Sequence, residues 1–278
     1  MSIIDGKEVS KLIKNNLKIE VAKLENKPKL VVILVGDDPA SKVYVNSKGK
    51  ACELVGINHD TILMDKESTE EEVLAVIEKA NADKEVDGIL LQLPLPKHLD
   101  SQKIINCINP SKDVDGLNVY NQGQLFMGSK NLVPCTPKGV IKLLEHYNVS
   151  LEGKRAIVIG RSLLVGKPLA MLLLEKNATV TIAHSHTKNL KDICLKMDIV
   201  ISAVGKPHFV TADMVKDKAV VIDVGINRTN EGLTGDVDFE EVSKKASLIT
   251  PVPGGVGPMT IACLLENVVE CYKNQMVK

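Results

Sequence analysis

The sequence contains no tryptophan and only four tyrosines and three phenylalanines, and it carries no net charge. Its 35 lysines and arginines balance 35 aspartates and glutamates, so no excess positive field favours nucleic acid or an anionic membrane surface. No apolar run approaches the roughly 18 residues of a membrane span, and the amphipathic N-terminus is unlike a secretory signal. These absences predict a cytoplasmic protein that has no nucleic-acid or membrane partner.

Disulfide and zinc frameworks are also missing. Six cysteines are scattered along 278 residues without a CxxC pair, a pattern that in a chain of this size is typical of reduced thiols. His184 and His186 lie two positions apart, but no carboxylate or cysteine stands beside them to complete a metal site. We therefore predict no disulfide framework and no bound metal.

Short apolar runs alternate with amphipathic helical patterns along most of the chain. Several of the runs lack polar alternation, as expected of parallel strands that are covered by helices on both faces. This alternation predicts an α/β fold with right-handed crossovers. The predicted strands cover residues 29–36, 57–64, 88–96, 155–160, 178–184, 198–205, 219–227 and 247–253. One predicted helix, over 68–81, has Ser68 or Thr69 as its cap.

The alternation breaks once, between about residues 110 and 137, where Gly, Asn, Pro and Ser are frequent and no period is sustained. Long irregular segments of this kind often carry function or separate domains. The helical pattern that starts at Thr136 is expected to bridge two halves. We predict one α/β domain over 1–138 and a second over 139–257. The final helix, about 258–274, is predicted to pack back on the first domain together with the rest of residues 258–278.

A strand-to-helix turn in the second half has features of a dinucleotide site. The strand ends at Gly160, Ser162 lies in the turn, and a helix starts near Gly166 or Lys167. This geometry places a pyrophosphate against backbone N–H groups at a helix N-terminus. The spacing departs from G-x-G-x-x-G, so it is also compatible with a tight turn that holds no ligand.

The end of the next strand bears on the choice between NAD and NADP. An NAD site usually has Asp or Glu there, about 20 residues further on, to hold the ribose hydroxyls. Here the strand ends in "AHSHT", with Ser185 between two histidines and no acid, while Arg161 lies in the turn itself. Because an arginine and a hydroxyl donor suit a 2′-phosphate, the sequence predicts NADP.

A lysine stands on the apolar side of the helix predicted over residues 40–56. At helical spacing, that side consists of Tyr44, Lys48, Ala51 and Val55. The opposite side consists of Lys42, Asn46, Gly49 and Glu53. A lysine in such a position either extends its ammonium to solvent or faces a pocket. A pocket disfavours the charged form, so Lys48 there could accept a proton near neutral pH.

Polar residues and a Gly/Pro-rich loop suggest further contacts. Gln92 interrupts an apolar strand and is either a satisfied core amide or faces the crevice where open α/β sheets bind ligands. Asp113 and Asp115 follow on a loop, and spacing alone does not choose between them. In "TPVPGGVGPMT", the backbone around Pro253 and Gly254 can approach a flat ligand closely, although the segment could also be a plain connector.

Taken together, several segments resemble one known family. "YVNSK", "QLPLP", "KDVDG", "PCTPKG", "GRSLLVGKP", "HSHT", "DVGIN" and "PVPGGVGPMT" occur in the order and spacing of the methylenetetrahydrofolate dehydrogenase/cyclohydrolase family. The resemblance covers essentially the whole chain. It implies an N-terminal folate-binding catalytic domain and a C-terminal Rossmann-like NADP domain, with a cleft between them, in a homodimer. The implied activity, in one-carbon metabolism, is oxidation of 5,10-methylenetetrahydrofolate with NADP followed by hydrolysis of the methenyl product to 10-formyltetrahydrofolate.

The resemblance also implies roles for single residues. Lys48 would be the central catalytic group, Gln92 would hydrogen-bond near it and tune it, and Tyr44 would stack on the aminobenzoyl ring of the folate. Asp115, rather than Asp113, matches the aspartate that holds the pterin. Substrate-binding residues would be Tyr44, Gln92, Asp115, Pro253 and Gly254. Cofactor-binding residues would be Gly160, Arg161, Ser162, Gly166 and Ser185, with Ile226 and Thr260 beside the nicotinamide.

Two alternatives stay open on the sequence. One is a methylenetetrahydrofolate dehydrogenase without hydrolase activity that uses NAD or NADP, and the other is a regulatory protein that binds a dinucleotide without catalysis. Members of the family that are dehydrogenases only lack the lysine found here at position 48, which favours both activities. A sensor would need no lysine beside Tyr44 on an apolar face.

Overall fold

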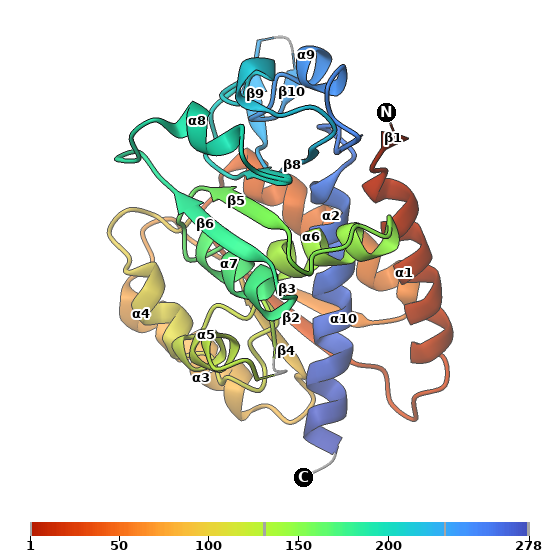
Figure 1. Cartoon of the computed structure of the whole chain (residues 1–278). Helices are drawn as coiled ribbons and strands as arrows, with labels where there is room; N and C mark the ends of the chain where they lie inside the picture. The colour runs from red at the N-terminus through yellow and green to blue at the C-terminus, as the bar shows by residue number, and fades with distance from the viewer. Residues whose placement is uncertain (1, 130–131, 231, 277–278) are drawn as a thin grey trace. The chain divides into compact units, whose positions relative to one another are not determined.

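The structure is a computed structural model that describes residues 2–129, 132–230 and 232–276 (Figure 1). The chain folds into two compact units. One unit, which we call the three-stranded unit, comprises Lys11–Cys135 and Ile261–Lys278. The other, the six-stranded unit, comprises Met1–Ser10 and Thr136–Thr260.

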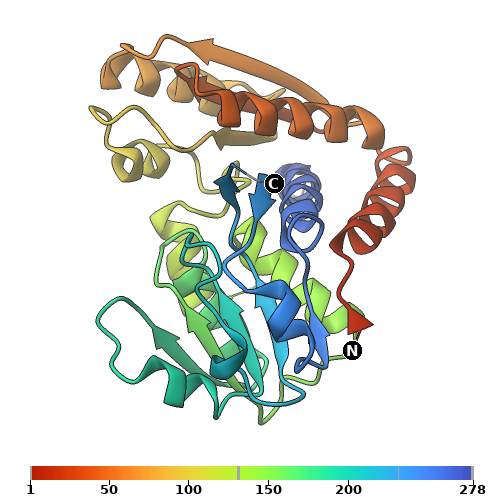
Figure 2. The same ribbon diagram turned by 90° about the horizontal axis from the view of Figure 1, so that it is seen from above.

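The three-stranded unit contains a parallel sheet in the order β3-β2-β4. Its strands are β2 (Lys29–Val35), β3 (Asn58–Met64) and β4 (Gly88–Leu91). Its helices are α1 (Gly6–Val21, from residue 11), α2 (Pro39–Val55), α3 (Glu70–Ala82), α4 (Ser101–Asn106), α5 (Val119–Phe126) and the later part of α10 (Val256–Met276). In Figure 2, β2, β3, α2 and α3 are drawn in red to orange and β4 in gold.

Alternate residues of β2 belong to two different core clusters. Leu30, Val32 and Leu34 pack in one cluster with residues of α2 and α10. Val31, Ile33 and Val35 pack in the other with residues of α3 and α4. Because both faces of this strand are buried, its sequence is apolar without alternation, as predicted for a covered parallel strand.

Local sequence explains where the helices of this unit begin and end. Asp38 precedes α2, and its Oδ2 accepts a 2.7 Å hydrogen bond from the backbone N–H of Ser41. Gly56 ends α2 in the left-handed region, at φ +86°, which glycine adopts without steric cost. Of the two predicted caps of α3, Thr69 is the one used, in a capping box with Glu72.

The segment 110–137, predicted to have no sustained period, contains α5. Asn118 starts this helix: its Oδ1 accepts a 2.8 Å hydrogen bond from the backbone N–H of Tyr120, and its Nδ2 donates to the carbonyl of Ile108 at 2.9 Å. A cap held by residues distant in sequence stabilises a short helix that periodicity does not indicate.

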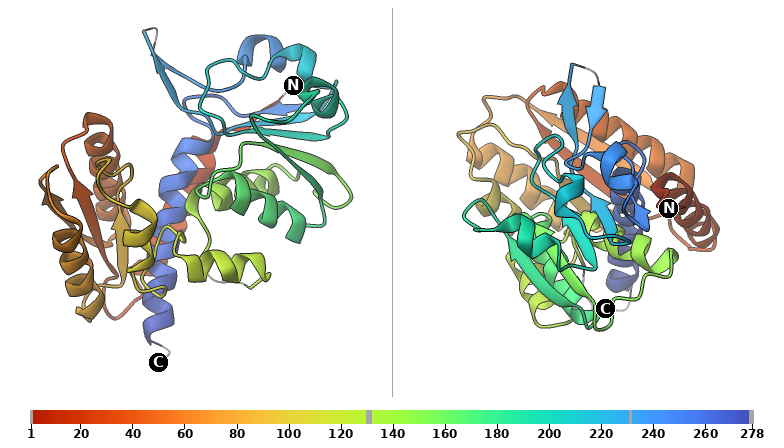
Figure 3. Two further views of the ribbon diagram at one scale, coloured as in Figure 1. Left: turned by 90° about the vertical axis from the view of Figure 1, so that its left-hand side faces the viewer. Right: turned by 45° about the horizontal axis from the view of Figure 1, so that its top comes forward.

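The six-stranded unit contains a parallel sheet in the order β1-β11-β8-β7-β5-β6. Its strands are β1 (Ser2–Ile3), β5 (Arg155–Ile159), β6 (Thr179–Ala183), β7 (Ile199–Ser202), β8 (Val220–Asp223) and β11 (Leu248–Ile249). Its helices are α6 (Cys135–His146), α7 (Gly166–Glu175), α8 (Leu190–Cys194), η1 (Ala212–Met214) and α9 (Phe239–Ser243). An antiparallel hairpin of β9 (Asn227–Thr229) and β10 (Gly232–Thr234) follows β8 and is visible in blue in Figure 3.

All eight predicted strands are present, each shorter than predicted, and the α/β fold with two parallel sheets is confirmed. The structure differs from the prediction at the N-terminus. Ser2 and Ile3 form β1 and pair in parallel with β11, so the first ten residues group with the six-stranded unit rather than with the first domain. Two paired residues are too few to leave a strand pattern in the sequence.

Candidate active site

The buried lysine of α2 contacts the amide that follows β4. Lys48 is 9% exposed, and its Nζ donates a 3.0 Å hydrogen bond to Oε1 of Gln92, which is 8% exposed. Nε2 of Gln92 donates to the carbonyl of Leu93 at 2.6 Å, so the amide oxygen is the atom that faces the lysine. β2 is the central strand of this sheet, with β3 on one side and β4 on the other. The carboxyl ends of β2 and β4 therefore flank a topological switch point. Open α/β sheets bind ligands at such a point.

The predicted faces of α2 are correct for the two lysines and wrong for two other residues. Lys48 is buried and Lys42 is exposed, as the helical spacing predicts. Gly49 is buried rather than exposed, because β3 approaches it so closely that a Cβ there would lie 2.6 Å from Nε2 of His59. Tyr44, predicted on the apolar side, is instead 40% exposed. Its ring is therefore accessible for stacking one turn before Lys48.

Asp113 is a structural residue of the loop. It is 1% exposed, and its Oδ2 accepts hydrogen bonds from the backbone N–H of Asn118 at 2.8 Å and from Nδ2 of Asn121 at 2.9 Å. Burial raises the pKa of Asp113 to about 6, against the effect of these hydrogen bonds. These contacts order the loop from within.

Asp115 has different neighbours. Burial of its carboxyl group raises its pKa, while the positive charge of Lys48 and a hydrogen bond from the thiol of Cys135 act in the opposite direction. Lys48 acts on the pKa of Asp115 but is not among the groups that act on the pKa of Asp113. Within one unit, Lys48 is therefore hydrogen-bonded to Gln92 and acts electrostatically on Asp115.

The predicted cofactor turn follows β5 at the switch point of the six-stranded sheet, where β5 lies between β6 and β7. Gly160 has φ +125°, and a Cβ there would lie 2.4 Å from the carbonyl oxygen of Ala203. A Cβ at Gly166 would lie 2.3 Å from the carbonyl oxygen of Gly160. Oγ of Ser162 accepts hydrogen bonds from the backbone N–H groups of Val165 at 3.1 Å and Gly166 at 3.3 Å. Both glycines are therefore required by close backbone approaches, as in a dinucleotide-binding turn.

Arg161 and Ser185 follow the carboxyl ends of the neighbouring strands β5 and β6 at equivalent positions. In the register of β5 and β6, Ile159 pairs with Ala183, and each of the two site residues comes two positions later. Both side chains are exposed, and no acidic residue stands at the end of β6. A cation and a hydroxyl without a carboxylate fit the 2′-phosphate of NADP, whereas the ribose hydroxyls of NAD usually find an acid at this place.

Other predicted residues also meet within the six-stranded unit. Ile226, 45% exposed, follows β8, and its Cδ1 lies 3.7 Å from where a Cβ of Gly257 would be. Thr260 shares a 3.0 Å hydrogen bond with the hydroxyl of Thr136. Pro253 is exposed and Gly254 has φ +112°, just before α10. The loop after β8 and the start of α10 are therefore neighbours.

Two buried aspartates outside the set of predicted site residues order the loops after β7 and β8. Asp236 is fully buried and accepts hydrogen bonds from the backbone N–H groups of Val204, Gly205 and Lys206 at 2.7–3.1 Å. Asp223 accepts from the backbone of Asp236 at 3.0 Å, and burial raises its pKa to about 6. The sequence contains a signal for both residues: Asp223 ends the apolar run "VVID", and Asp236 lies in "GDVD".

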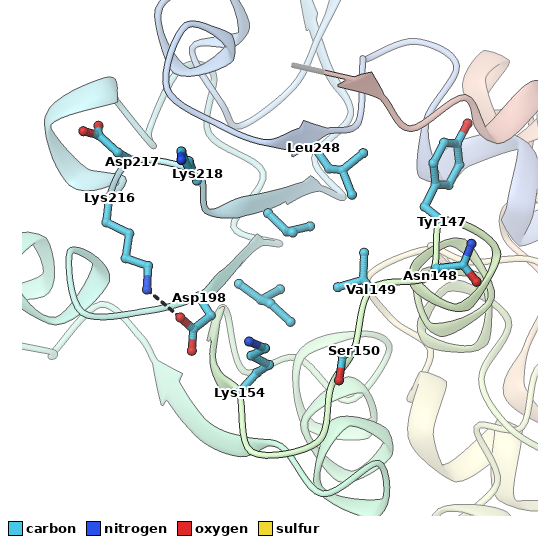
Figure 4. Close-up of a pocket in the computed structure, with 12 residues that line it drawn as sticks. Tyr147, Asn148, Val149, Ser150, Lys154, Asp198, Lys216, Asp217, Lys218 and Leu248 are labelled. Carbon is cyan, nitrogen blue, oxygen red and sulfur yellow. Dashed lines mark hydrogen bonds and ion pairs between the residues drawn. The ribbon is translucent and has the colours of Figure 1, made fainter.

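A hollow of about 460 Å³ in the six-stranded unit lies at the amino-terminal ends of the strands, opposite the ends that the cofactor turn follows (Figure 4). It is lined by Ile199 and Val220, the first residues of β7 and β8, and by Leu248 of β11. Figure 4 shows the ion pair of Lys216 with Asp198 at its side. Since the cofactor turn follows the carboxyl ends of the strands, this hollow is separate from it, and none of the predicted site residues lines it.

Within residues 2–129, 132–230 and 232–276, no three His, Cys, Asp or Glu side chains gather as a metal ion would require. No helix in the same ranges is long and apolar enough to span a membrane. Within the described ranges, the six cysteines are thiols rather than disulfide partners.

These features define a class. The chain has two parallel α/β units, one with a glycine-bearing turn whose surroundings fit NADP and one with a buried lysine and amide at a switch point and a half-buried carboxyl group that the lysine acts on. Such a chain is typical of dinucleotide-dependent enzymes.

The chain belongs to the tetrahydrofolate dehydrogenase/cyclohydrolase family. A model of the family's catalytic domain matches residues 4–115, and a model of its NAD(P)-binding domain matches residues 134–276. The bifunctional protein FolD of Agathobacter rectalis is 55% identical over 276 residues, which are 98% of this chain and 99% of that protein.

Solved structures agree with this assignment. The bifunctional enzyme FolD, a methylenetetrahydrofolate dehydrogenase/cyclohydrolase from Campylobacter jejuni, is 50% identical with a TM-score of 0.97, and the match covers 99% of each chain. The methylenetetrahydrofolate dehydrogenase-cyclohydrolase of Trypanosoma brucei, solved with NADP and an inhibitor, is 38% identical with a TM-score of 0.95 and covers 100% of this chain and 99% of that one. The family predicted from the sequence motifs is confirmed.

Proposed function

We propose that Lys48, Gln92 and Asp115 are the catalytic centre of this chain. The chain is a methylenetetrahydrofolate dehydrogenase and a methenyltetrahydrofolate cyclohydrolase: it oxidises 5,10-methylenetetrahydrofolate with NADP and hydrolyses the product to 10-formyltetrahydrofolate. The observation that carries the assignment of the centre is the buried hydrogen bond from Nζ of Lys48 to Gln92. Hydrolysis needs a proton acceptor, and this is the buried amine at the switch point of the substrate domain.

Lys48 acts in both halves of the hydrolysis. Water adds to the cationic methenyl carbon, and the attacking water must lose a proton to a nearby base. Opening of the carbon–nitrogen bond then needs a proton on the leaving nitrogen. One amine that takes the proton from the attacking water can then give it to the leaving nitrogen, so a single group performs both transfers in turn. Oε1 of Gln92 accepts from Nζ and so fixes the direction in which the amine points.

Asp115 and Tyr44 hold the substrate in this proposal. The carboxyl group of Asp115 accepts hydrogen bonds from N–H groups of the pterin, and its place beside Lys48 brings the reacting carbon to the amine. The ring of Tyr44 stacks on the aminobenzoyl ring, for which its partial exposure leaves it accessible. Pro253 and Gly254 contribute a rigid backbone contact to the same substrate.

The oxidation step needs alignment more than acid–base chemistry. NADP, when bound, supplies the acceptor for the hydride, which a folate nitrogen lone pair helps to expel. Gly160, Ser162 and Gly166 form the turn against which the pyrophosphate binds, and Arg161 and Ser185 bind the 2′-phosphate. Ile226 and Thr260 contact the nicotinamide. A dehydrogenase without hydrolase activity would not need the buried lysine.

We also propose that the enzyme works as a homodimer in the cytoplasm. The resemblance to a dimeric family supports the dimer, and six free thiols suit a reducing compartment. Sedimentation equilibrium tests the dimer: a mass near twice 30.2 kDa supports it, and a mass near 30.2 kDa at micromolar concentration contradicts it.

An absorbance assay tests the proposed function. Purified protein is mixed with methylenetetrahydrofolate and either NADP or NAD, and the methenyl product is followed as it forms and decays. We expect formation to be faster with NADP than with NAD at equal concentration, and enzyme-dependent decay of the methenyl compound. If the methenyl product forms but its decay is not accelerated, only the dehydrogenase activity is supported. If no methenyl product forms with either NADP or NAD, the proposed function is contradicted.

A further inference from the structure

Asn267 of α10 lies behind the loop that carries Asp115. It is 1% exposed, and its Nδ2 donates hydrogen bonds to the carbonyl oxygens of Val114 at 2.8 Å and Val133 at 2.9 Å. Val114 immediately precedes Asp115 in the sequence, and Val133 lies two positions before Cys135. One buried amide nitrogen, with two hydrogens to donate, therefore ties together two segments that are 19 positions apart, all within the three-stranded unit.

The same two segments also touch directly. Gly116, the residue after Asp115, has φ +66°, and a Cβ there would lie 2.8 Å from the carbonyl carbon of Val133. The loop around Asp115 therefore has no room to move towards residues 132–134. The tie made by Asn267 prevents it from moving in the opposite direction.

Asn267 is also linked to the carboxyl group of Asp115 through the thiol of Cys135. Sγ of Cys135 lies 3.6 Å from Nδ2 of Asn267 and 3.4 Å from the carbonyl oxygen of Val114. The thiol of Cys135 also makes a hydrogen bond with Asp115. The backbone before Asp115 and the thiol beside it are thus both held by one side chain of α10.

We infer that Asn267 is a positioning residue that fixes Asp115 against Lys48 and so sets the affinity for the folate substrate. The inference rests on the proposed roles of these two residues. The loss of Nδ2 would leave the carbonyl oxygen of Val133 without this donor and that of Val114 with only the weak thiol donor of Cys135, and the loop would have to move to reach water or a stronger partner. Such a movement displaces Asp115, the group that holds the pterin, while the cofactor turn is unaffected.

The test compares Asn267→Ala with a matched control on the same helix. Gln275 also donates from an amide nitrogen to two carbonyls, but these are the carbonyls of Asp87 at 2.9 Å and Cys271 at 3.0 Å, which lie outside both segments of the loop. Gln275→Ala is therefore a change of the same kind away from the site. KM for methylenetetrahydrofolate, KM for NADP and the melting temperature are measured for both variants.

We expect Asn267→Ala to raise KM for the folate by about tenfold or more and KM for NADP by less than about twofold, whereas Gln275→Ala changes neither KM by more than about twofold. The loss of the thiol contact should also raise the pKa of Asp115 further, so the limb of the pH–kcat/KM profile that reports it moves to higher pH. A purely structural role would lower the melting temperature without moving this limb.

Asn267→Ser keeps the inference testable if Asn267→Ala does not fold. Its hydroxyl has one hydrogen and can retain at most one of the two carbonyl contacts, so we expect a smaller rise in the same KM. Parallel rises in both KM values, or equal effects of Asn267→Ala and Gln275→Ala, would overturn the inference. If Asp115→Asn raises KM for the folate and Asn267→Ala does not, only the positioning role fails and the proposed function stands.

Discussion

Nζ of Lys48 lies 3.0 Å from Oε1 of Gln92, although the two residues are 44 positions apart in the sequence and belong to different elements. Both side chains are almost fully buried. The amide that follows β4 accepts from an amine on α2, so the sheet and the helix together set the direction of the amine. The chemistry proposed for the site depends on this direction.

Replacement of Gln92 tests whether the amide tunes the lysine. Gln92→Met has a similar volume and only a weak thioether acceptor in place of the amide oxygen, so Nζ of Lys48 loses its strong partner and its fixed direction. We expect kcat for hydrolysis of methenyltetrahydrofolate to fall by roughly 10- to 100-fold, within the range of general acid–base effects. Gln102→Met, at an exposed position of α4, is the control and should retain the rate. An unchanged rate in Gln92→Met would show that the hydrogen bond has no catalytic role.

Arg161→Ala tests the 2′-phosphate contact. A charge-assisted hydrogen bond contributes about 1.5–3 kcal/mol, so the loss should raise KM for NADP by roughly 10- to 100-fold and leave KM for NAD nearly unchanged. Arg155, at the amino end of the same strand, provides the control variant Arg155→Ala, which should affect neither. Steady-state kinetics give KM for NADP and KM for NAD in each variant. Equal changes of the two KM values in Arg161→Ala would refute the contact with the 2′-phosphate.

The two aspartates of the "KDVDG" loop should separate function from stability. Asp115→Asn removes a carboxylate beside Lys48, and we expect KM for methylenetetrahydrofolate to rise by about tenfold or more with a change in melting temperature of only a few degrees. Asp113→Asn acts on the buried loop and should change stability while leaving KM within about twofold. The reverse pattern would show that the assignment of the two residues is wrong.

The pH dependence of stability should report Asp113. Because burial raises its pKa to about 6 from 3.8, the folded state binds a proton more tightly than the unfolded state. Its contribution to the free energy of unfolding is therefore fully present below about pH 4 and is lost as pH rises through about 6, by up to roughly 3 kcal/mol.

Chemical denaturation of wild type and Asp113→Asn between about pH 4 and 7 measures this contribution. The amide oxygen of the variant can keep the contacts to Asn118 and Asn121 but does not titrate. Wild type should thus lose its advantage over the variant as pH rises. A difference that is constant over this range, or that grows with pH, would contradict the raised pKa.

Much of the fold follows from local pattern. The runs over β2, β5, β7 and β8 are apolar because helices cover both faces, and this leaves a plain signal in the sequence. Lys48 was predictable for a related reason: helical spacing places it among buried residues whatever its partners are. β1 was not predictable, because its two residues become a strand only when β11 lies beside them.

The partners within the site depend on contacts that periodicity does not contain. Helical spacing places Gly49 on the exposed side of α2, and a glycine has no side chain that would indicate otherwise, yet His59 packs against it. The choice between Asp113 and Asp115 depends on which carboxyl group turns towards Lys48, and the spacing of two residues in an irregular loop does not determine this. Asn267 lies on an apolar helix and reads as a core residue until its two carbonyl partners are seen.

Lys48→Met tests the central claim most directly, with Lys42→Met, an exposed lysine of the same helix, as its control. Hydrolysis of methenyltetrahydrofolate and the Kd for NADP are measured for both variants. We expect Lys48→Met to lose hydrolysis by about 100-fold or more with Kd for NADP within about twofold of wild type, and Lys42→Met to retain both. Hydrolysis by Lys48→Met at nearly the wild-type rate would contradict the role of Lys48 as the proton-transfer group.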